Sequence, residues 1–339
     1  MRGPTVAQGR AVARELLAAS GVEPLAAAQT AHALVLADAW GVHSHGLLRL
    51  PDYLLRLQGG GCNAAAELRP VADTGALVTF DGENGLGHWQ LWRAAELARD
   101  RCADHGVATV AVGRSSHCGA LGVYTLPLVE AGLVGLVFSH GPAVMPPWNG
   151  TSAVVSTSPL AAGIPTHPEP AIVDLATSAV ARGRIKVHAQ RGEPLPEGWA
   201  FTADGEPTTD ARAALDGMLA PLGGAKGFAL AFLVEALTAG LVGPVLSTDV
   251  VDMFNPADAG RPQQIAHLVL ALDPARLDVD GKGSGDRLDR LAETVVGAGG
   301  RLPGASRSSR LDEQALLGVS EQTWTAVGEW ASRLGVAIG

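Results

Sequence analysis

Residues 89–112 read WQLWRAAELARDRCADHGVATVAV, and they say more about the architecture than any other stretch of the 339-residue chain. Over residues 89–105 alanine and leucine recur at helical spacing, which predicts a helix. Residues 107–112 form a short apolar run rich in valine, which is typical of a buried strand. A second helix over residues 121–131 and a second strand over residues 133–139 follow. We therefore expect an α/β fold.

Further strands are expected in the middle of the chain and further helices toward its ends. The additional strand-like runs are residues 76–80, 153–156, 171–174 and 266–272. The additional helical patterns are residues 6–19, 24–40, 224–243, 311–317 and 320–334. The helix at 224–243 is apolar nearly all round, which predicts that it is buried. The terminal helices should pack as one discontinuous helical domain, residues 1–72 and 297–339, beside an α/β domain of residues 73–296.

The composition is that of a globular protein and excludes several functional classes. Hydrophobic residues make up 47% of the chain and charged residues 17%, which suffices to bury a core. A formal net charge of −9, without any basic cluster, opposes nonspecific nucleic-acid binding. No apolar run is long enough and free enough of charges to span a membrane. Cys62, Cys102 and Cys118 form neither a disulfide framework nor a zinc pattern, so we expect a cytoplasmic protein.

Two segments offer histidines flanked by small residues, where a substrate could approach closely. One holds Ser44 and His45, with Arg49 close behind, and the other holds His117. Histidine has a pKa near neutrality and suits general acid–base catalysis. Arg49 follows His45 by four residues and would share its face on a helix. A guanidinium at that place could bind a substrate carboxylate through two parallel hydrogen bonds.

A third segment suits an anionic ligand. Residues 221–227 form a glycine-rich turn, with Gly224 and Lys226, at the start of the apolar helix. Free backbone N–H groups and the helix dipole favour a phosphate there. The turn lacks the spacing of a P-loop, and Gly85-x-Gly87 lacks the third glycine of a Rossmann fingerprint. Proton-transfer groups together with an anion site indicate an enzyme that uses a nucleotide cofactor.

A series of motifs follows one family's order along most of the chain. These motifs are Ser44-His45-Gly46, Arg49-Leu50-Pro51-x-Tyr53, Asp81-Gly82-x-Asn84-Gly85-x-Gly87, Ser116-His117-x-Gly119, Asp174-Leu175-Ala176-Thr177-Ser178 and Leu222-Gly223-Gly224-x-Lys226-Gly227. In these motifs the chain resembles the malate/L-lactate dehydrogenase family of the second type. That family includes malate, sulfolactate and ureidoglycolate dehydrogenases and reductases of piperideine- and pyrroline-2-carboxylate.

The resemblance implies a homodimer that holds NADH or NADPH in a non-Rossmann manner, in a domain built on a largely antiparallel mixed sheet. The implied reaction transfers a hydride to a small 2-oxo acid, from a 2-hydroxy acid in reverse, or to a cyclic 2-imino acid. The partner is thus a small-molecule carboxylate. The implied cofactor contacts are Asp174, Leu175, Ala176, Gly224 and Lys226.

The resemblance also implies roles for the motif residues. His45 and His117 both correspond to proton donors assigned in family members, and the choice stays open with a slight preference for His117. Ser44 would donate to the substrate oxygen, Arg49 would bind the carboxylate, and Tyr53 would line the substrate site. Each residue also has a structural alternative. His45 and His117 could be histidines hydrogen-bonded in turns, Ser44 could be a turn or helix-cap serine, and Arg49 could form a surface ion pair. The histidines expected to be structural or peripheral are His43, His88, His140 and His267.

Four positions depart from the family pattern near the expected site, namely His140, Gly141, Ser158 and Ala305. They leave the substrate open and motivate an alternative, in which a degenerate member binds a metabolite or partner without hydride transfer. A further alternative is a nucleophilic Cys118 beside His117. It is disfavoured because adjacent residues on an extended segment point to opposite sides.

Overall fold

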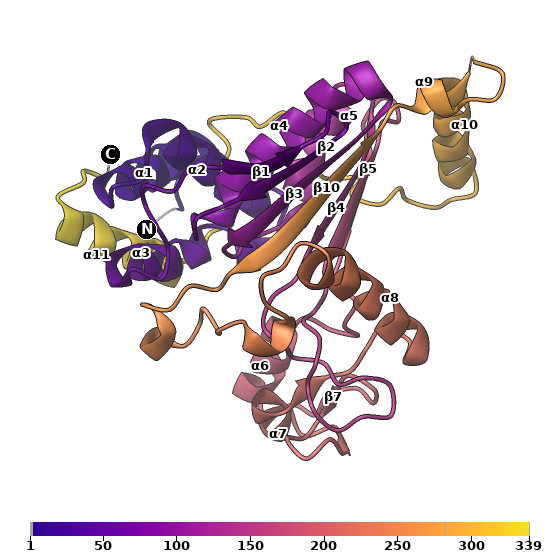
Figure 1. The fold of residues 1–339 in the computed structure, drawn as a ribbon. Helices are drawn as coiled ribbons and strands as arrows, with labels where there is room; N and C mark the ends of the chain where they lie inside the picture. The colour runs from indigo at the N-terminus through magenta and orange to yellow at the C-terminus, as the bar shows by residue number, and fades with distance from the viewer. Residues whose placement is uncertain (1–2, 282, 339) are drawn as a thin grey trace.

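In a computed structural model that describes residues 3–281 and 283–338, helices from the two ends of the chain lie side by side (Figure 1). They are α1 (Val6–Ala19), α2 (Pro24–Ala39), α3 (Leu50–Gly59) and α11 (Glu321–Leu334). Thr5 and Gln8 form a capping box that begins α1, and Ser320 caps α11. The apolar faces of all four helices meet in one buried core. The two ends of the chain thus stabilise each other.

The centre of the molecule is a seven-stranded sheet in the order β1-β2-β3-β10-β4-β5-β6. The strands are β1 (Arg69–Asp73), β2 (Leu77–Asp81), β3 (Val107–Ser115), β4 (Val134–Ser139), β5 (Leu160–Ile164), β6 (Ala171–Leu175) and β10 (Ile265–Leu272). Only β2 and β3 run parallel, and every other neighbouring pair is antiparallel. This confirms a mixed α/β fold with a mostly antiparallel sheet.

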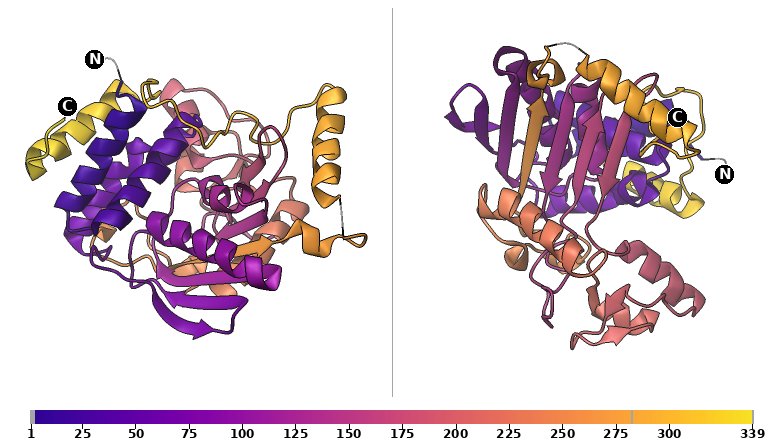
Figure 2. Two further views of the ribbon diagram at one scale, coloured as in Figure 1. Left: turned by 90° about the horizontal axis from the view of Figure 1, so that it is seen from above. Right: turned by 90° about the vertical axis from the view of Figure 1, so that its right-hand side faces the viewer.

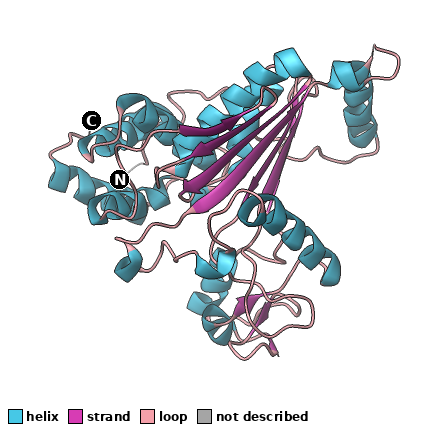
Figure 3. Cartoon of the chain, viewed as in Figure 1, coloured by secondary structure: helices cyan, strands magenta, loops and turns pink. Residues whose placement is uncertain are grey.

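One face of the sheet is covered by α4 (Gly87–His105) and α5 (Leu126–Val129), which follows the 3₁₀ turn η3 (Leu121–Thr125) (Figure 3). Leucine and alanine side chains of α4 pack on Val110 and Val269 in a second buried core. The small alanines let the helix approach the strands closely. The other face of β4, β5 and β10 remains half-exposed.

A smaller module hangs below the sheet in Figure 1. It contains a three-stranded sheet, in the order β8-β7-β9, with its own core. Its elements are α6 (Arg182–Arg191), β7 (Ala200–Phe201), β8 (Pro207–Thr208), α7 (Ala211–Asp216), β9 (Met218–Leu219) and α8 (Ala225–Glu235). Leu222 donates its backbone N–H to the Thr177 carbonyl at 2.8 Å, which ties the start of α8 to the segment after β6.

Shorter elements complete the chain. A π-helical turn (Ala236–Gly240) extends α8, and the 3₁₀ turns are η1 (His43–His45), η2 (Leu47–Arg49), η5 (Ser247–Asp249) and η6 (Pro256–Asp258). Two helices, α9 (Pro274–Leu277) and α10 (Ser284–Gly297), stand at the end of the molecule away from α11 (Figure 2). Within the part of the chain that the structure describes, no helix has the length and apolarity that a membrane span requires.

Three expectations about single elements are wrong. Residues 153–156 form no strand, because only a single bridge joins Val155 to Met145. Residues 311–317 form no helix but run as turns toward the N-terminus, where Leu316 bridges to Thr5. The helix at 224–243 is not buried all round, since Phe232 is 62% exposed.

Candidate active site

The loop between α2 and α3 brings Ser44, His45 and Arg49 together as two successive 3₁₀ turns. The hydroxyl of Ser44 lies 2.8 Å from Nδ1 of His45. Arg49 does not share a helical face with His45 but folds back, and its Nε donates to the carbonyl of Ser44 at 2.8 Å. The guanidinium therefore lies beside the imidazole, although the loop is not the helix that the four-residue spacing favoured.

Tyr53 of α3 joins this loop to the end of β3. Its hydroxyl lies 2.7 Å from Nδ1 of His117, and the backbone N–H of Gly119 donates to the same nitrogen at 3.4 Å. A nitrogen that accepts from an N–H carries no proton of its own, so Tyr53 donates as well. The neutral ring of His117 therefore holds its proton on Nε2.

The two candidate proton donors face each other. The rings of His45 and His117 are stacked, with centroids 5.8 Å apart and planes inclined by 20°. Burial, followed by the charge of Arg49, lowers the pKa of His45 from 6.5 to about 4. Burial and the neighbouring His45, His88 and Arg49 hold the pKa of His117 well below its ordinary value. Both rings are therefore neutral at pH 7 in this structure.

Two residues around Arg49 were not anticipated from the sequence. The carboxylate of Asp52 lies 3.3 Å from the guanidinium, and the ring of Phe254 lies under it at 4.3 Å from the centroid. The side chain of Arg49 keeps 25% of its surface exposed. Asp52 has a signal in sequence, its place three residues after Arg49 on the start of a helix. Phe254 has none, because it comes from a distant segment.

Two histidines expected to be structural or peripheral lie directly behind the pair. The ring of His88 meets Tyr53 edge-on, with centroids 4.7 Å apart, and burial lowers its pKa to about 3. His267 donates from Nε2 to the carbonyl of Ser116 at 3.1 Å and is likewise fully buried. Both rings are neutral and shape the wall behind His117.

Cys118 is not suited to nucleophilic catalysis. It is 4% exposed, and burial raises the pKa of its thiol to about 12. Since the thiolate is the nucleophile, a thiol that stays protonated at neutral pH is unreactive. The hydrolase or transferase alternative therefore has no support in the environment of Cys118.

The glycine-rich turn before α8 fits an anionic cofactor group. Gly223 and Gly224 have φ of 60° and 70°, and a Cβ on Gly224 would lie 2.9 Å from the ring of Trp148. No side chain caps α8, so the first backbone N–H groups of the helix are available to a ligand. Lys226 is exposed and makes no ion pair with any residue in the described ranges. Close backbone approach, free donors and a cation together suit a dinucleotide phosphate.

Asp174, Leu175 and Ala176 lie where β6 ends. The carboxylate of Asp174 accepts the Gly122 N–H at 3.0 Å and lies 3.5 Å from Arg307. Burial raises its pKa, whereas those two partners lower it. Asp174 thus approaches the segment after His117, because η3 carries Gly122. Among the described residues, no hydrogen bond or ion pair joins Lys226 or Gly224 to the histidines, so the site consists of two separate parts.

The four departures from the family pattern occupy turns around these parts. His140 accepts the Ala266 N–H at 3.1 Å through Nδ1, and Gly141 follows it. Ser158 has a φ of 41°, which the Ser156 hydroxyl supports by accepting its N–H at 2.9 Å. Ala305 lies in the turn closed by its own N–H and the Leu302 carbonyl.

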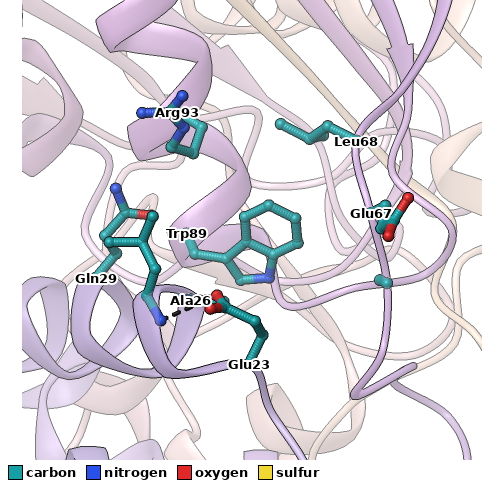
Figure 4. A pocket seen from close by; sticks show the side chains of 9 residues that line it. Glu23, Ala26, Gln29, Glu67, Leu68, Trp89 and Arg93 are labelled. Carbon is teal, nitrogen blue, oxygen red and sulfur yellow. Dashed lines mark hydrogen bonds between the residues drawn. The ribbon is translucent and has the colours of Figure 1, made fainter.

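A separate pocket of about 230 Å³ lies between α2, α4 and residues 66–68 (Figure 4). Trp89, Arg93 and Glu23 line it, but no histidine or glycine-rich turn does. It therefore lacks the groups needed for proton transfer. Among residues 3–281 and 283–338, no three His, Cys, Asp or Glu side chains are arranged to hold a metal ion.

Comparisons with known proteins agree along the whole chain. A family model described as malate/L-lactate dehydrogenase matches residues 5–326. The (2R)-3-sulfolactate dehydrogenase (NADP(+)) of Chromohalobacter salexigens is 38% identical over 86% of this chain and 86% of its own. The Delta(1)-pyrroline-2-carboxylate/Delta(1)-piperideine-2-carboxylate reductase of Pseudomonas aeruginosa is 36% identical over 82% and 83%. The structure of sulfolactate dehydrogenase from Methanocaldococcus jannaschii superimposes with a TM-score of 0.90 at 27% identity, covering 100% and 98%.

Proposed function

Because the chain belongs to the malate/L-lactate dehydrogenase family, we propose that it is an NAD(P)H-dependent oxidoreductase. Its substrate is a small 2-oxo acid, with the 2-hydroxy acid in the reverse direction, or a cyclic 2-imino acid. The observation that carries the proposal is the contact of Tyr53 with His117 beside His45 and Arg49. It assembles a proton-transfer group and a carboxylate-binding group in one place.

Proton transfer is assigned to the histidine pair. Bound NAD(P)H would supply the hydride to the substrate carbon. Negative charge that develops on the carbonyl oxygen, or on the imine nitrogen, takes a proton from His117 or His45. For His117 the donor would be the imidazolium ion, which loses its Nε2 proton and returns to the neutral ring whose Nδ1 accepts from Tyr53 and Gly119. The hydroxyl of Ser44 donates a hydrogen bond to the carbonyl oxygen of a 2-oxo acid substrate.

Binding of the substrate carboxylate prepares this step. Arg49 holds the carboxylate with its planar guanidinium, and Tyr53 lines the same space. The incoming negative charge offsets the effect of Arg49 on both imidazoles and raises their pKa values. A bound carboxylate therefore favours the protonated form of the histidine that donates the proton.

The cofactor is assigned to the two segments at the far side of the site. Lys226, Gly224 and the N-terminus of α8 would hold phosphate oxygens, and Asp174, Leu175 and Ala176 would contact the part nearer His117. The bond from Leu222 to Thr177 supports a common surface, because it joins the two segments. This arrangement is a non-Rossmann one, since the phosphate turn follows no parallel βαβ unit.

A homodimer is part of the same proposal. Phe232 and Leu233 of α8 are 62% and 50% exposed, and Leu241 after the π-helical turn is 76% exposed. Apolar side chains also line the half-exposed face of β4, β5 and β10. We expect a second copy of the chain to cover these apolar surfaces. Within each copy, residues 1–72 and 297–339 would form a helical domain beside the α/β domain of residues 73–296. A cytoplasmic location is proposed from the three free, buried cysteines.

Titration with NADH and NADPH in parallel tests the proposal, with tryptophan fluorescence as the readout. Trp148 is expected to report, because its ring lies against Gly224. We expect saturable quenching by one of the two nucleotides, with a smaller quenching amplitude in Trp148→Phe. Turnover is then assayed with Δ1-piperideine-2-carboxylate and with a panel of 2-oxo acids that includes sulfopyruvate. Cofactor binding without turnover of any of these would favour the non-catalytic alternative, and failure to bind either cofactor would overturn the proposal.

A further inference from the structure

The carboxylate of Asp38 is buried under the loop that carries Ser44, His45 and Arg49. Asp38 occupies the last turn of α2, and its side chain is 2% exposed. One carboxylate oxygen accepts the backbone N–H of Leu47 at 2.7 Å. The loop therefore closes over a charged group that water does not reach.

The second carboxylate oxygen of Asp38 contacts the loop at another point. It lies 3.0 Å from Nδ1 of His43, the residue that precedes Ser44. Among the described residues, no lysine or arginine pairs with Asp38. A buried carboxylate is costly unless it is hydrogen-bonded. The loop supplies both of these partners, so loop and carboxylate depend on each other.

Gly46 shows how closely the loop surrounds this group. A Cβ at Gly46 would lie 2.2–2.3 Å from the carboxylate atoms of Asp38. Its φ is −94°, outside the left-handed region, so the space taken by the carboxylate is itself a reason for glycine at this position. The residue between His45 and Leu47 is thus small because the carboxylate occupies the position of a side chain.

The far side of His43 is supported by the C-terminal segment. A Cβ at Gly318 would lie 2.8 Å from Cε1 of His43, so backbone packs directly against the ring. The neighbouring Leu317 donates its N–H to Pro4 at 2.9 Å and belongs to the terminal core. His43 is therefore held between Asp38 and a fixed part of the molecule.

We propose that Asp38 is a positioning residue for the reaction, whose carboxylate sets the shape of loop 43–49 through Leu47 and His43. The inference rests on the proposed function of that loop. Asp38 touches neither substrate nor cofactor; it fixes the backbone from which His45 and Arg49 extend. A displacement of about 1 Å in such groups can lower catalysis about a hundredfold without removing any of them.

The first test is Asp38→Asn, with Asp100→Asn as the matched control on the surface of α4. The amide keeps the size of the side chain but loses its charge, and it holds both Leu47 and His43 only if its NH2 group donates to Nδ1 of His43, so the anchor is weakened. We expect amide hydrogen exchange across residues 43–49 to rise at least about tenfold, with little change elsewhere. The value of kcat/KM should fall about tenfold to a hundredfold with KM rising, whereas the Kd for NADPH stays within about threefold.

A second test uses the space at Gly46. Gly46→Ala should lower kcat/KM at least about tenfold in the otherwise unchanged protein, because the new methyl group displaces the carboxylate. In an Asp38→Ala background the same change should cost less than about threefold, because the space is then free. Two residues that act through one contact are non-additive in this way. Equal losses in both backgrounds would overturn the proposal.

The exchange measurement separates this proposal from the proposed function. If the wild type turns over no compound of the panel, the function fails, but loop exchange still tests the anchor. If Asp38→Asn loosens α2 as a whole, His43→Ala becomes the deciding variant. It removes one partner of the Asp38 carboxylate and leaves the bond from Leu47 in place. Faster exchange confined to residues 43–49 supports the anchor. Unchanged exchange and unchanged kcat/KM in His43→Ala contradict it.

Discussion

The hydroxyl of Tyr53 donates to Nδ1 of His117 at 2.7 Å, across a sequence separation of 64 residues. This bond joins the helix after the Arg49 loop to the segment that directly follows β3. It also fixes the tautomer of His117, because the proton must then lie on Nε2. One contact thus controls both the position and the protonation pattern of a candidate proton donor.

Tyr53→Phe should separate those effects from stability. The ring still packs against His88, and only the hydroxyl is lost. We expect kcat/KM to fall at least about tenfold and its dependence on pH to become flatter. The free energy of unfolding, measured in urea, should fall by only about 1 kcal/mol. Tyr124→Phe is the matched control, because Tyr124 is equally buried and donates to the Cys118 carbonyl. A similar loss of activity in both variants would assign the effect to general packing.

Replacement of each histidine should identify the proton donor. His117→Ala or His45→Ala should lower kcat by about two to four orders of magnitude, the scale of lost general acid–base catalysis. The donor is the one whose removal also abolishes the dependence of kcat on pH. The proton-transfer assignment fails when both single variants keep more than about a tenth of the wild-type kcat.

Arg49→Lys should weaken carboxylate binding. Lysine keeps the charge but cannot make the planar two-point contact or stack on Phe254 in the same way. We expect KM for carboxylate substrates to rise at least about tenfold, with a smaller change in kcat. Arg93→Lys serves as the control, since Arg93 pairs with Glu96 on the surface of α4. A KM equal to that of the control would mean that Arg49 does not bind the substrate.

Gly224→Ala should weaken cofactor binding. The residue has φ of 70°, and a methyl group there would meet the ring of Trp148 at 2.9 Å. A φ of 70° with a ψ of −125° is readily adopted only by glycine, so the strain in alanine would shift the turn. We expect the Kd for the preferred nucleotide to rise about tenfold or more. Gly285→Ala on α10, where a Cβ meets nothing within 4 Å, should leave the Kd unchanged.

The buried histidines should make stability depend on pH. Burial lowers the pKa values of His88 and His267 from 6.5 to about 3. Between those values the unfolded chain binds more protons than the folded one, so the free energy of unfolding falls as pH is lowered from about 6.5. Each histidine contributes a slope that approaches about 1.4 kcal/mol per pH unit well below pH 6.5, and about 1.3 kcal/mol in total between pH 7 and pH 5.5.

Urea unfolding at pH 7 and pH 5.5 measures this slope. His88→Leu should reduce it, because one of the buried histidines whose pKa is lowered is removed. His167→Gln should not, since the side chain of His167 is 80% exposed. A slope that is the same in all three proteins would mean that His88 is not held neutral by the fold.

Much of the fold could be predicted from local pattern. The long helix α4 and the strands β3, β4 and β10 combine clear periodicity with boundaries close to those expected. The strand β5 was not expected, because Leu160–Ile164 is short and rich in alanine and glycine and becomes a strand only by pairing with β4 and β6. The helix expected at residues 311–317 lost to tertiary contacts with Thr5.

The site could be predicted only in part for a related reason. His45, Arg49, Tyr53 and His117 stand in recognisable motifs, but the distance between Tyr53 and His117 depends on the pairing of distant elements. Phe254 carries no motif at all and reaches Arg49 through a turn of the chain. The sequence pattern therefore indicates the candidate reactive residues, whereas their neighbours follow from topology.

The place of β10 in the sheet affects the synthesis of this protein. β10 lies between β3 and β4, yet it follows β6 in the chain by about ninety residues. On the ribosome, the two halves β1-β2-β3 and β4-β5-β6 therefore emerge with their inner edges open. Open edges pair readily with other chains, so the nascent protein is most exposed to aggregation until Leu272 has left the exit tunnel. Translation pauses upstream of β10 would lengthen that period, and holding chaperones would be needed most during it.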